Sequence, residues 1–279
     1  DVYVDDDWSD ITISDDPDAT GPATAFGYDA FDNITDAMAA VSDGGTIHIL
    51  DGIYTENDIT INKAVSVVGT GSDLVTLDAF VTVSGNTNGF LIQADDVSLT
   101  GMTILNAVDS IQIDGQTISN LNINDLVFEE NTSLGYGSSG VTISNSTVAN
   151  MTLANSHFIN IYNGINLYNA SRIDGLTVTD STFHVDNDGI KGPISDLTLT
   201  GSTFSNNSVG LRAELFGNIF IDDNTFTSNI TGLFISNDAD AANGPTDQIL
   251  IQNNTFTDHK LSAIRFVESA DLGVRVLDV

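Results

Sequence analysis

A repeated pattern of aliphatic residues and Phe constrains the fold of this chain more than any other feature of the sequence. Each copy has an alternating aliphatic segment, a small polar pair, a Phe and a turn rich in Asn or Asp. The clearest copies read MTLANSHFIN, LTVTDSTFHVDN, LTLTGSTFSNN, IFIDDNTFTSN and ILIQNNTFTDH, with Phe158, Phe183, Phe204, Phe226 and Phe256. Because these Phe residues recur every 21 to 30 positions, the chain is expected to be a stack of similar small units.

A second short strand follows each polar turn and begins with Gly or Ala. These segments are GINLY at 164–168, GIKGP at 189–193, GLRAE at 210–214, GLFIS at 232–236 and AIRFV at 263–267. One such unit cannot bury its apolar residues alone, but units stacked about 4.8 Å apart form continuous apolar ladders. The sequence therefore predicts an all-β chain folded as a single parallel β-helix, right-handed by the general rule for parallel crossovers.

One short amphipathic helix is expected before the repeats. In the segment GYDAFDNITDAMAAVSDGG the apolar residues recur at helical spacing, with Asp29 as the expected N-cap and Gly44 as the stop. Such a helix would cap an end of the solenoid that otherwise exposes its core. We therefore divide the chain into residues 1–45, with an N-terminal strand, a loop and the capping helix, and residues 46–279, which form one continuous β-helix of about ten coils.

The charge of the chain excludes several classes of partner. Seven Lys and Arg against 39 Asp and Glu give a net charge of −32, which repels nucleic acid and anionic membranes. No apolar stretch is long enough to insert into a membrane. The chain begins without Met, as a mature secreted fragment or an excised domain would, so we expect an extracellular or cell-surface protein.

Any cation would have to bind to oxygen or His ligands, because the chain has no Cys. No cofactor is required, and calcium is the cation that the acidic surface would suit. The candidate ligands are Asp5, Asp7, Asp15 and Asp18, although they show no ligand loop of defined spacing. Solvated charge is the alternative explanation for these carboxylates.

The repeat, together with the opening segments VYVDDDW, DDPDATGPATAFGYDAF and DGGTIHILDGIYTENDITINK, resembles the pectin-lyase-like right-handed parallel β-helix superfamily. The opening is similar to the N-terminal β-helix modules of large secreted and surface-attached repeat proteins. The resemblance implies the fold strongly and the function weakly, because the superfamily includes lyases, hydrolases, adhesins, phage tailspikes and structural surface proteins.

Lys191 and Arg212 follow a Gly and a branched aliphatic residue in successive copies, so strand alternation places both on the outer surface as neighbours. In polysaccharide lyases of this superfamily, an Arg or Lys removes a proton next to a uronate carboxylate, usually with calcium. The resemblance would make Lys191 and Arg212 the candidate catalytic residues, with Glu214 or Asp188 supporting them. The alternative is that Asp188 and Glu214 simply neutralise the two cations in weak surface ion pairs.

Three functions follow for testing. The first is a secreted or cell-surface non-catalytic protein with a structural or adhesive role, which assembles with copies of itself or with adjoining domains of a larger surface protein. The second is a calcium-assisted polysaccharide lyase or another carbohydrate-active enzyme. The third is a glycan-binding module, with Tyr168 and Phe234 as stacking platforms and Arg265 as a further contact.

Overall fold

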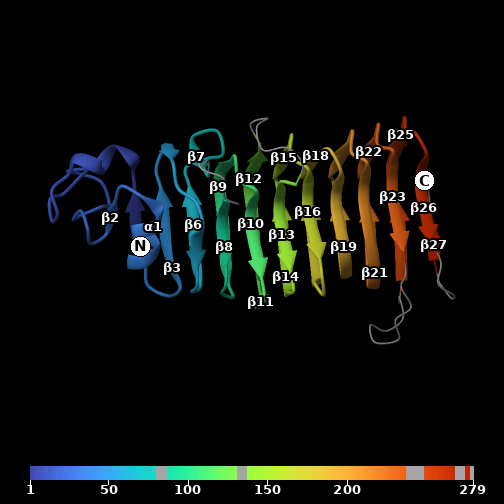
Figure 1. The fold of residues 1–279 in the computed structure, drawn as a ribbon, viewed down its shortest axis with the longest axis horizontal. Helices are drawn as coiled ribbons and strands as arrows, with labels where there is room; N and C mark the ends of the chain where they lie inside the picture. The colour runs from blue at the N-terminus through green and yellow to red at the C-terminus, as the bar shows by residue number, and fades with distance from the viewer. Residues whose placement is uncertain (80–86, 131–136, 237–247, 268–273, 277–279) are drawn as a thin grey trace.

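The computed structural model describes residues 1–79, 87–130, 137–236, 248–267 and 274–276, and these form a rod of stacked strands (Figure 1). Every described strand pair is parallel, and the strands of successive turns lie side by side along the long axis. The N-terminal residues lie at one end of the rod and the last strands at the other. The predicted all-β, right-handed parallel β-helix is confirmed.

The strands form three walls, which we call faces A, B and C. Face A contains β3 (Gly45–Ile49), β6 (Val65–Gly69), β9 (Val97–Leu105), β12 (Asn122–Glu129), β14 (Thr147–Ala154), β17 (Arg172–Thr179), β19 (Asp188–Thr200), β21 (Val209–Asp222), β24 (Gln248–Gln252) and β27 (Val274–Val276). These ten strands mark ten turns, as predicted. β9 and β12 continue round a corner into face B, whereas β19 and β21 begin on face C and end on face A.

The other two faces are built in the same way. Face B contains β4 (Gly52–Tyr54), β7 (Val75–Asp78), the ends of β9 and β12, β15 (His157–Ile159), β18 (Thr182–His184), β20 (Thr203–Ser205), β22 (Thr225–Thr227) and β25 (Thr255–Thr257). Face C contains β5 (Ile59–Ile61), β8 (Asn88–Ile92), β10 (Asp109–Asp114), β13 (Ser139–Ser144), β16 (Asn163–Tyr168), the starts of β19 and β21, β23 (Thr231–Ser236) and β26 (Ser262–Val267). The short strand β11 (Thr117–Ser119) lies at the corner between faces C and A, where it pairs with β14.

The N-terminal end has two short strands, two short helices and a loop. β1 (Val2–Val4) pairs with both β2 (Ala30–Phe31) and β3, so it adds one further strand to face A. The 3-10 helix η1 (Asp6–Asp10) and the helix α1 (Ile34–Ala40) flank β2 in the sequence. Within the described ranges, no helix has the length and apolar character needed to cross a membrane.

The cap of α1 differs from the sequence-based expectation. The N-cap is Asn33, whose side chain accepts the N–H of Asp36 at 2.7 Å, rather than Asp29. The Asp29 carboxylate instead accepts the N–H groups of Thr24 at 3.0 Å and Ala25 at 2.8 Å within the preceding loop. The helix ends at Ala40, before the expected stop. Both Asp and Asn suit an N-cap, so composition alone did not discriminate between the two positions.

The predicted Phe ladder forms the centre of the core. Six rings stack in sequence with centroids 4.4 to 5.0 Å apart, and they belong to Phe128, Phe158, Phe183, Phe204, Phe226 and Phe256. The first five are fully buried. Because the strand spacing matches a favourable distance for ring stacking, the Phe of each of these six turns packs directly on the Phe of the next.

A second buried ladder is polar and lies at the corner between faces A and B. Each member accepts a hydrogen bond from the backbone N–H of the equivalent residue one turn earlier, at 2.9 to 3.2 Å, beginning with the N–H of Leu126. The members are Ser156, Ser181, Ser202, Asn224 and Asn254, all buried. The ladder satisfies backbone donors where the chain turns and regular strand pairing is interrupted.

Candidate functional site

Three of the seven basic residues lie in one outward column on face C. The column consists of Asn166, Lys191, Arg212, Phe234 and Arg265, which are partners in register on five consecutive turns; we call it the cationic column. Neighbouring members are therefore about one strand spacing, 4.8 Å, apart. The predicted outward alignment of these side chains is confirmed, since the aliphatic residue before each of the middle three members is fully buried.

Asp188 and Arg212 form a buried, bidentate ion pair. Arg212 donates from Nε to Oδ2 of Asp188 at 2.8 Å and from Nη2 to Oδ1 at 3.2 Å. The Asp188 side chain is only 2% exposed, whereas that of Arg212 is 37% exposed. The expectation of a weak surface pair is therefore wrong for these two residues, because Asp188 starts β19 at a position that the wall covers. A two-point contact of this kind orients the guanidinium plane.

Phe234 lies between two guanidinium groups. The Cζ atoms of Arg212 and Arg265 are each 5.2 Å from its ring centroid, and the two Arg residues belong to the turns before and after Phe234. Both faces of the ring are thus covered, and only its edge is directed outward. Phe234 does not offer the free ring face that stacking on a sugar would need; instead it separates and orients two cations.

The remaining predicted site residues are arranged differently. Lys191 is half-exposed and forms no ion pair within the described residues, and the same is true of Glu214. Glu214 lies two residues after Arg212 on the same strand, beside Pro193 and Ser236 rather than beside Lys191. Tyr168 is 41% exposed and lies two residues beyond Asn166. It remains accessible at the edge of the column.

Asn166 is a feature of the column that sequence reasoning missed. Its Oδ1 atom is buried and accepts no hydrogen bond within the described part of the chain. Unsatisfied buried acceptors are uncommon in folded proteins. Its Cα partner on the next turn is Lys191, so an unpaired acceptor lies beside an unpaired donor. Whether the Asn166 oxygen finds a donor depends on side-chain rotamers, which a sequence pattern does not predict.

The candidate calcium ligands do not converge. Asp5 caps η1 by accepting the N–H of Asp7 at 3.0 Å, and burial raises its pKa. The carboxylate of Asp18 accepts the N–H groups of Gly21 and Ala23. Among the described residues, no group of three or more His, Asp or Glu side chains is placed to hold a metal ion. Calcium binding therefore stays a prediction without a preformed site in this part of the chain.

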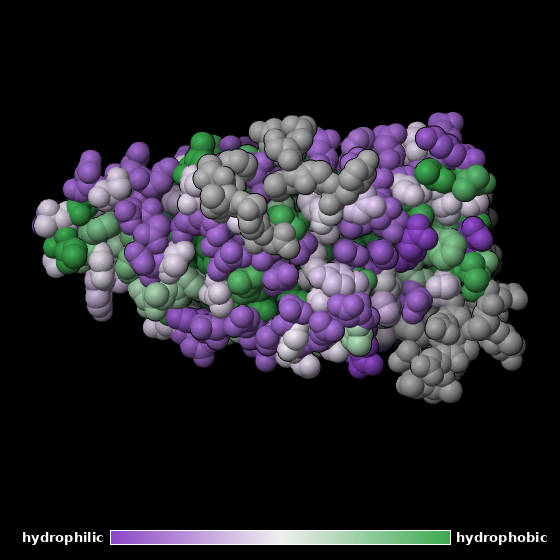
Figure 2. All heavy atoms as spheres, viewed as in Figure 1, coloured by the Kyte–Doolittle hydropathy of each residue, from purple (hydrophilic) through white to green (hydrophobic). Residues whose placement is uncertain are grey.

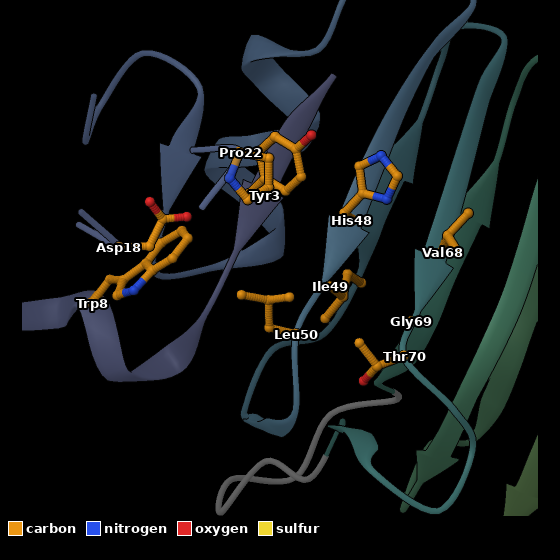
Figure 3. Close-up of a pocket in the computed structure, with 10 residues that line it drawn as sticks. All are labelled: Tyr3, Trp8, Asp18, Pro22, His48, Ile49, Leu50, Val68, Gly69 and Thr70. Carbon is orange, nitrogen blue, oxygen red and sulfur yellow. The ribbon is translucent and has the colours of Figure 1, made fainter. Parts of the chain in front are cut away.

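An apolar cavity of about 260 Å³ lies between the N-terminal loop and the outer wall of β3 and β6 (Figure 3). Its lining includes Tyr3, Trp8, His48 and Val68, with Asp18 beside Trp8. The Tyr3 and His48 rings stack at 5.0 Å, and burial, followed by the charge of the terminal amine, lowers the pKa of His48. The cavity forms only when residues far apart in sequence meet, so the sequence pattern did not indicate it.

The C-terminal part of the chain matches a known family model. Residues 163–276 match the model described as "Right handed beta helix region". This range includes every member of the cationic column. No curated protein sequence is significantly similar to this chain.

The comparison with solved structures finds similar chains at low identity. A PL6 family alginate lyase, AlyGC, is 12% identical with a TM-score of 0.50, over 88% of this chain and 37% of that chain. This chain thus spans little more than a third of that lyase. Pectin methylesterase PemA from Erwinia chrysanthemi is 12% identical with a TM-score of 0.41, over 99% and 92% of the two chains. An endo-xylogalacturonan hydrolase from Aspergillus tubingensis is 13% identical with a TM-score of 0.34, over 88% and 94%.

Proposed function

Because the chain has the right-handed parallel β-helix fold of the pectin-lyase-like superfamily, we propose that it is a secreted or cell-surface adhesive protein that binds an acidic polysaccharide along the cationic column. The observation that carries the proposal is the gathering of Lys191, Arg212 and Arg265 on one wall of a protein with a net charge of −32. A local group of cations attracts an anionic polymer that the rest of the surface repels.

The geometry of the column suits an extended polymer. The members follow one another along the solenoid axis at about 4.8 Å, a distance comparable to the length of one sugar residue in an extended chain. Such a polymer would meet one turn of the solenoid per sugar. Uronate carboxylates would accept hydrogen bonds from the cations, and the exposed ring of Tyr168 would stack on a sugar.

Arg212 keeps free hydrogen-bond donors although two of its N–H groups already bind Asp188. A guanidinium has five N–H donors, and two of them are used by Asp188. The buried carboxylate balances the charge of Arg212, so this residue supplies directed donors, whereas Lys191 and Arg265 supply net positive charge. Specific orientation and electrostatic attraction thus come from different members of the column.

Binding is tested by calorimetry with polymannuronate, polygalacturonate and neutral dextran. We expect the two polyuronates to bind and dextran not to bind, with weaker binding at high salt. Lys191→Gln and Arg265→Gln should each lower the affinity at least about tenfold. The matched controls are Lys260→Gln and Arg172→Gln, which remove exposed cations outside the column. Equal loss in the controls, or no binding to either polyuronate, would overturn the proposal.

Calcium-assisted lyase activity is the second candidate. The observation in its favour is that Lys191 and Arg212 occupy equivalent positions on successive turns, where one could remove a proton while the other contacts the uronate. Incubation with both polyuronates and calcium would then produce unsaturated uronates, detected by their ultraviolet absorbance. Products that disappear in Lys191→Gln but persist in Lys260→Gln would replace the non-catalytic proposal with this one.

Assembly with further copies or with adjoining domains is a separate part of the proposal. In the last described turn, Ile264 and Phe266 are only partly buried and Leu261 is 76% exposed. Within the described residues, β26 pairs on one side only, with β23. An open strand edge and apolar side chains favour association with another solenoid turn. Light scattering across a range of protein concentrations tests this, and a monomer at every concentration would contradict self-assembly.

A further inference from the structure

The two Arg residues that enclose Phe234 lie two turns of the solenoid apart. Arg212, Phe234 and Arg265 occupy three consecutive turns, so the two Arg residues are two strand spacings, about 9.6 Å, apart. Each Cζ atom lies 5.2 Å from the ring centroid. The aromatic ring excludes a third cation from the middle position. The column therefore presents donor, uncharged spacer and donor on successive turns.

The two ends of this arrangement differ in rigidity. Arg212 is held by Asp188 on the turn before it and by the Phe234 ring on the turn after it. Arg265 is exposed and, within the described residues, forms no ion pair. A fixed contact at one end orients a ligand, and an adaptable contact at the other accommodates its exact length.

In a flat, diequatorially linked polyuronate, the spacing of the carboxylates along one edge matches the separation of Arg212 and Arg265. In an extended ribbon of this type, each sugar is turned by half a revolution relative to its neighbour. The carboxylates consequently alternate between the two edges, and those on one edge recur at every second sugar. Since one sugar is comparable in length to one turn of the solenoid, carboxylates on one edge recur at about the separation of Arg212 and Arg265.

We infer that the Arg212–Phe234–Arg265 group selects flat, two-fold polyuronates by binding the carboxylates of sugars i and i+2, while the carboxylate of the sugar between them points away from Phe234. This inference rests on the proposed polysaccharide binding and specifies the repeat that is recognised. The uncharged ring edge of Phe234 faces the sugar that contributes no carboxylate. Replacing the spacer by a cation would lose this selectivity, because every sugar position would then meet a donor.

The inference is tested with oligosaccharides of mannuronate. By calorimetry, the trisaccharide should bind roughly tenfold more tightly than the disaccharide, because only the trisaccharide reaches both Arg residues. A trisaccharide whose central carboxylate is reduced to the alcohol should bind within about twofold of the unmodified one. Reduction of either terminal carboxylate should lower the affinity to that of the disaccharide.

Variants separate recognition from a merely structural role. Arg212→Gln and Arg265→Gln should each remove the advantage of the trisaccharide over the disaccharide, and the double variant should bind the trisaccharide more weakly than either single variant, because neither carboxylate contact remains. Phe234→Leu should weaken the coupling between the two positions with little change in thermal stability. Phe220→Leu is the matched control, since Phe220 is also outward and half-exposed but lies on face A.

The outcomes distinguish the two proposals. If polyuronates bind but the centrally reduced trisaccharide loses as much affinity as the terminally reduced ones, the two-sugar repeat is wrong and polysaccharide binding stands. Equal effects of Phe234→Leu and Phe220→Leu would also overturn the role of the spacer. If no uronate of any length binds to the unmodified protein, both the proposed function and this inference fail.

Discussion

The carboxylate of Asp188 lies inside the solenoid wall and binds the guanidinium of Arg212 on the next turn through two hydrogen bonds, of 2.8 and 3.2 Å. Burial of a carboxylate is unfavourable unless it is paired and hydrogen-bonded. The pair therefore links two turns through side chains as well as through the backbone, and it orients a residue of the cationic column.

Asp188→Asn is expected to lower the free energy of unfolding by about 2 kcal/mol. Removal of one partner from a buried pair typically costs about 3–5 kcal/mol, and the partial exposure of Arg212 reduces that penalty. The measurement is the denaturant midpoint of the variant. Asp186→Asn, which changes an exposed carboxylate two residues earlier, should leave the midpoint unchanged. Equal shifts in the two variants would show that the pair contributes no more than any surface charge.

Phe183→Ala tests the stacked core. The Phe183 ring lies between Phe158 at 4.5 Å and Phe204 at 4.6 Å and is fully buried. Truncation leaves a cavity in the middle of the ladder and should cost about 3–5 kcal/mol. Phe256→Ala should cost less, because Phe256 is only partly buried. Thermal and denaturant unfolding measure both. A larger effect at Phe256 would mean that stability is concentrated at the C-terminal turns.

Much of the fold follows from the sequence because the repeat encodes it. The Phe spacing predicts the ladder, and strand alternation predicts that Lys191 and Arg212 point outward together. The same alternation was insufficient for Asp188, since the general preference of Asp for the surface outweighed its position at the start of β19. The cation–π contacts of Phe234 and the unpaired oxygen of Asn166 depend on rotamers across turns, which a linear pattern does not specify.

The polar ladder has a signal in the sequence, although the aliphatic and Phe pattern alone does not predict it. Ser156, Ser181 and Ser202 each stand two residues before the Phe of their repeat, and Asn occupies the same place in the next two copies. A small polar residue that recurs at one position of a buried unit indicates a side chain that serves the backbone. By contrast, the cavity beside Trp8 has no such signal, because a loop must first fold onto the outer wall.

Asn224 tests the polar ladder through two replacements. Its side chain accepts the N–H of Ser202 at 2.9 Å and donates to the carbonyl oxygen of Leu199 at 2.9 Å. Asn224→Ser restores the residue found in earlier turns and should cost about 1 kcal/mol. Asn224→Leu leaves buried polar groups without partners and should cost about 3 kcal/mol. Denaturant unfolding of the two variants gives the comparison, and equal costs would indicate that packing, rather than hydrogen bonding, determines this position.

The last prediction concerns Asp109, a partly buried carboxylate on β10 that accepts the hydroxyl hydrogen of Thr142 at 2.5 Å. Burial raises the pKa of Asp109 above the ordinary value of 3.8, and the bond from Thr142 offsets part of that rise. Between the ordinary and the raised pKa, the folded state binds more protons than the unfolded state. The contribution of Asp109 to stability is therefore present at low pH and is lost as the pH rises through its folded-state pKa.

Asp109→Asn should consequently stabilise the protein at neutral pH, because the amide is uncharged and its oxygen still accepts the bond from Thr142. The advantage over the unmodified protein should shrink as the pH falls through the raised folded-state pKa and disappear below 3.8, where the carboxyl group becomes protonated in both states. Asp114→Asn, at an exposed position of the same strand, is the matched control and should show no such dependence. Unfolding midpoints of the variants and the unmodified protein across this pH range test the prediction. If Asp109→Asn were less stable than the unmodified protein at neutral pH, Thr142 would require the charged acceptor. The cost of burying Asp109 would then be compensated in the folded state.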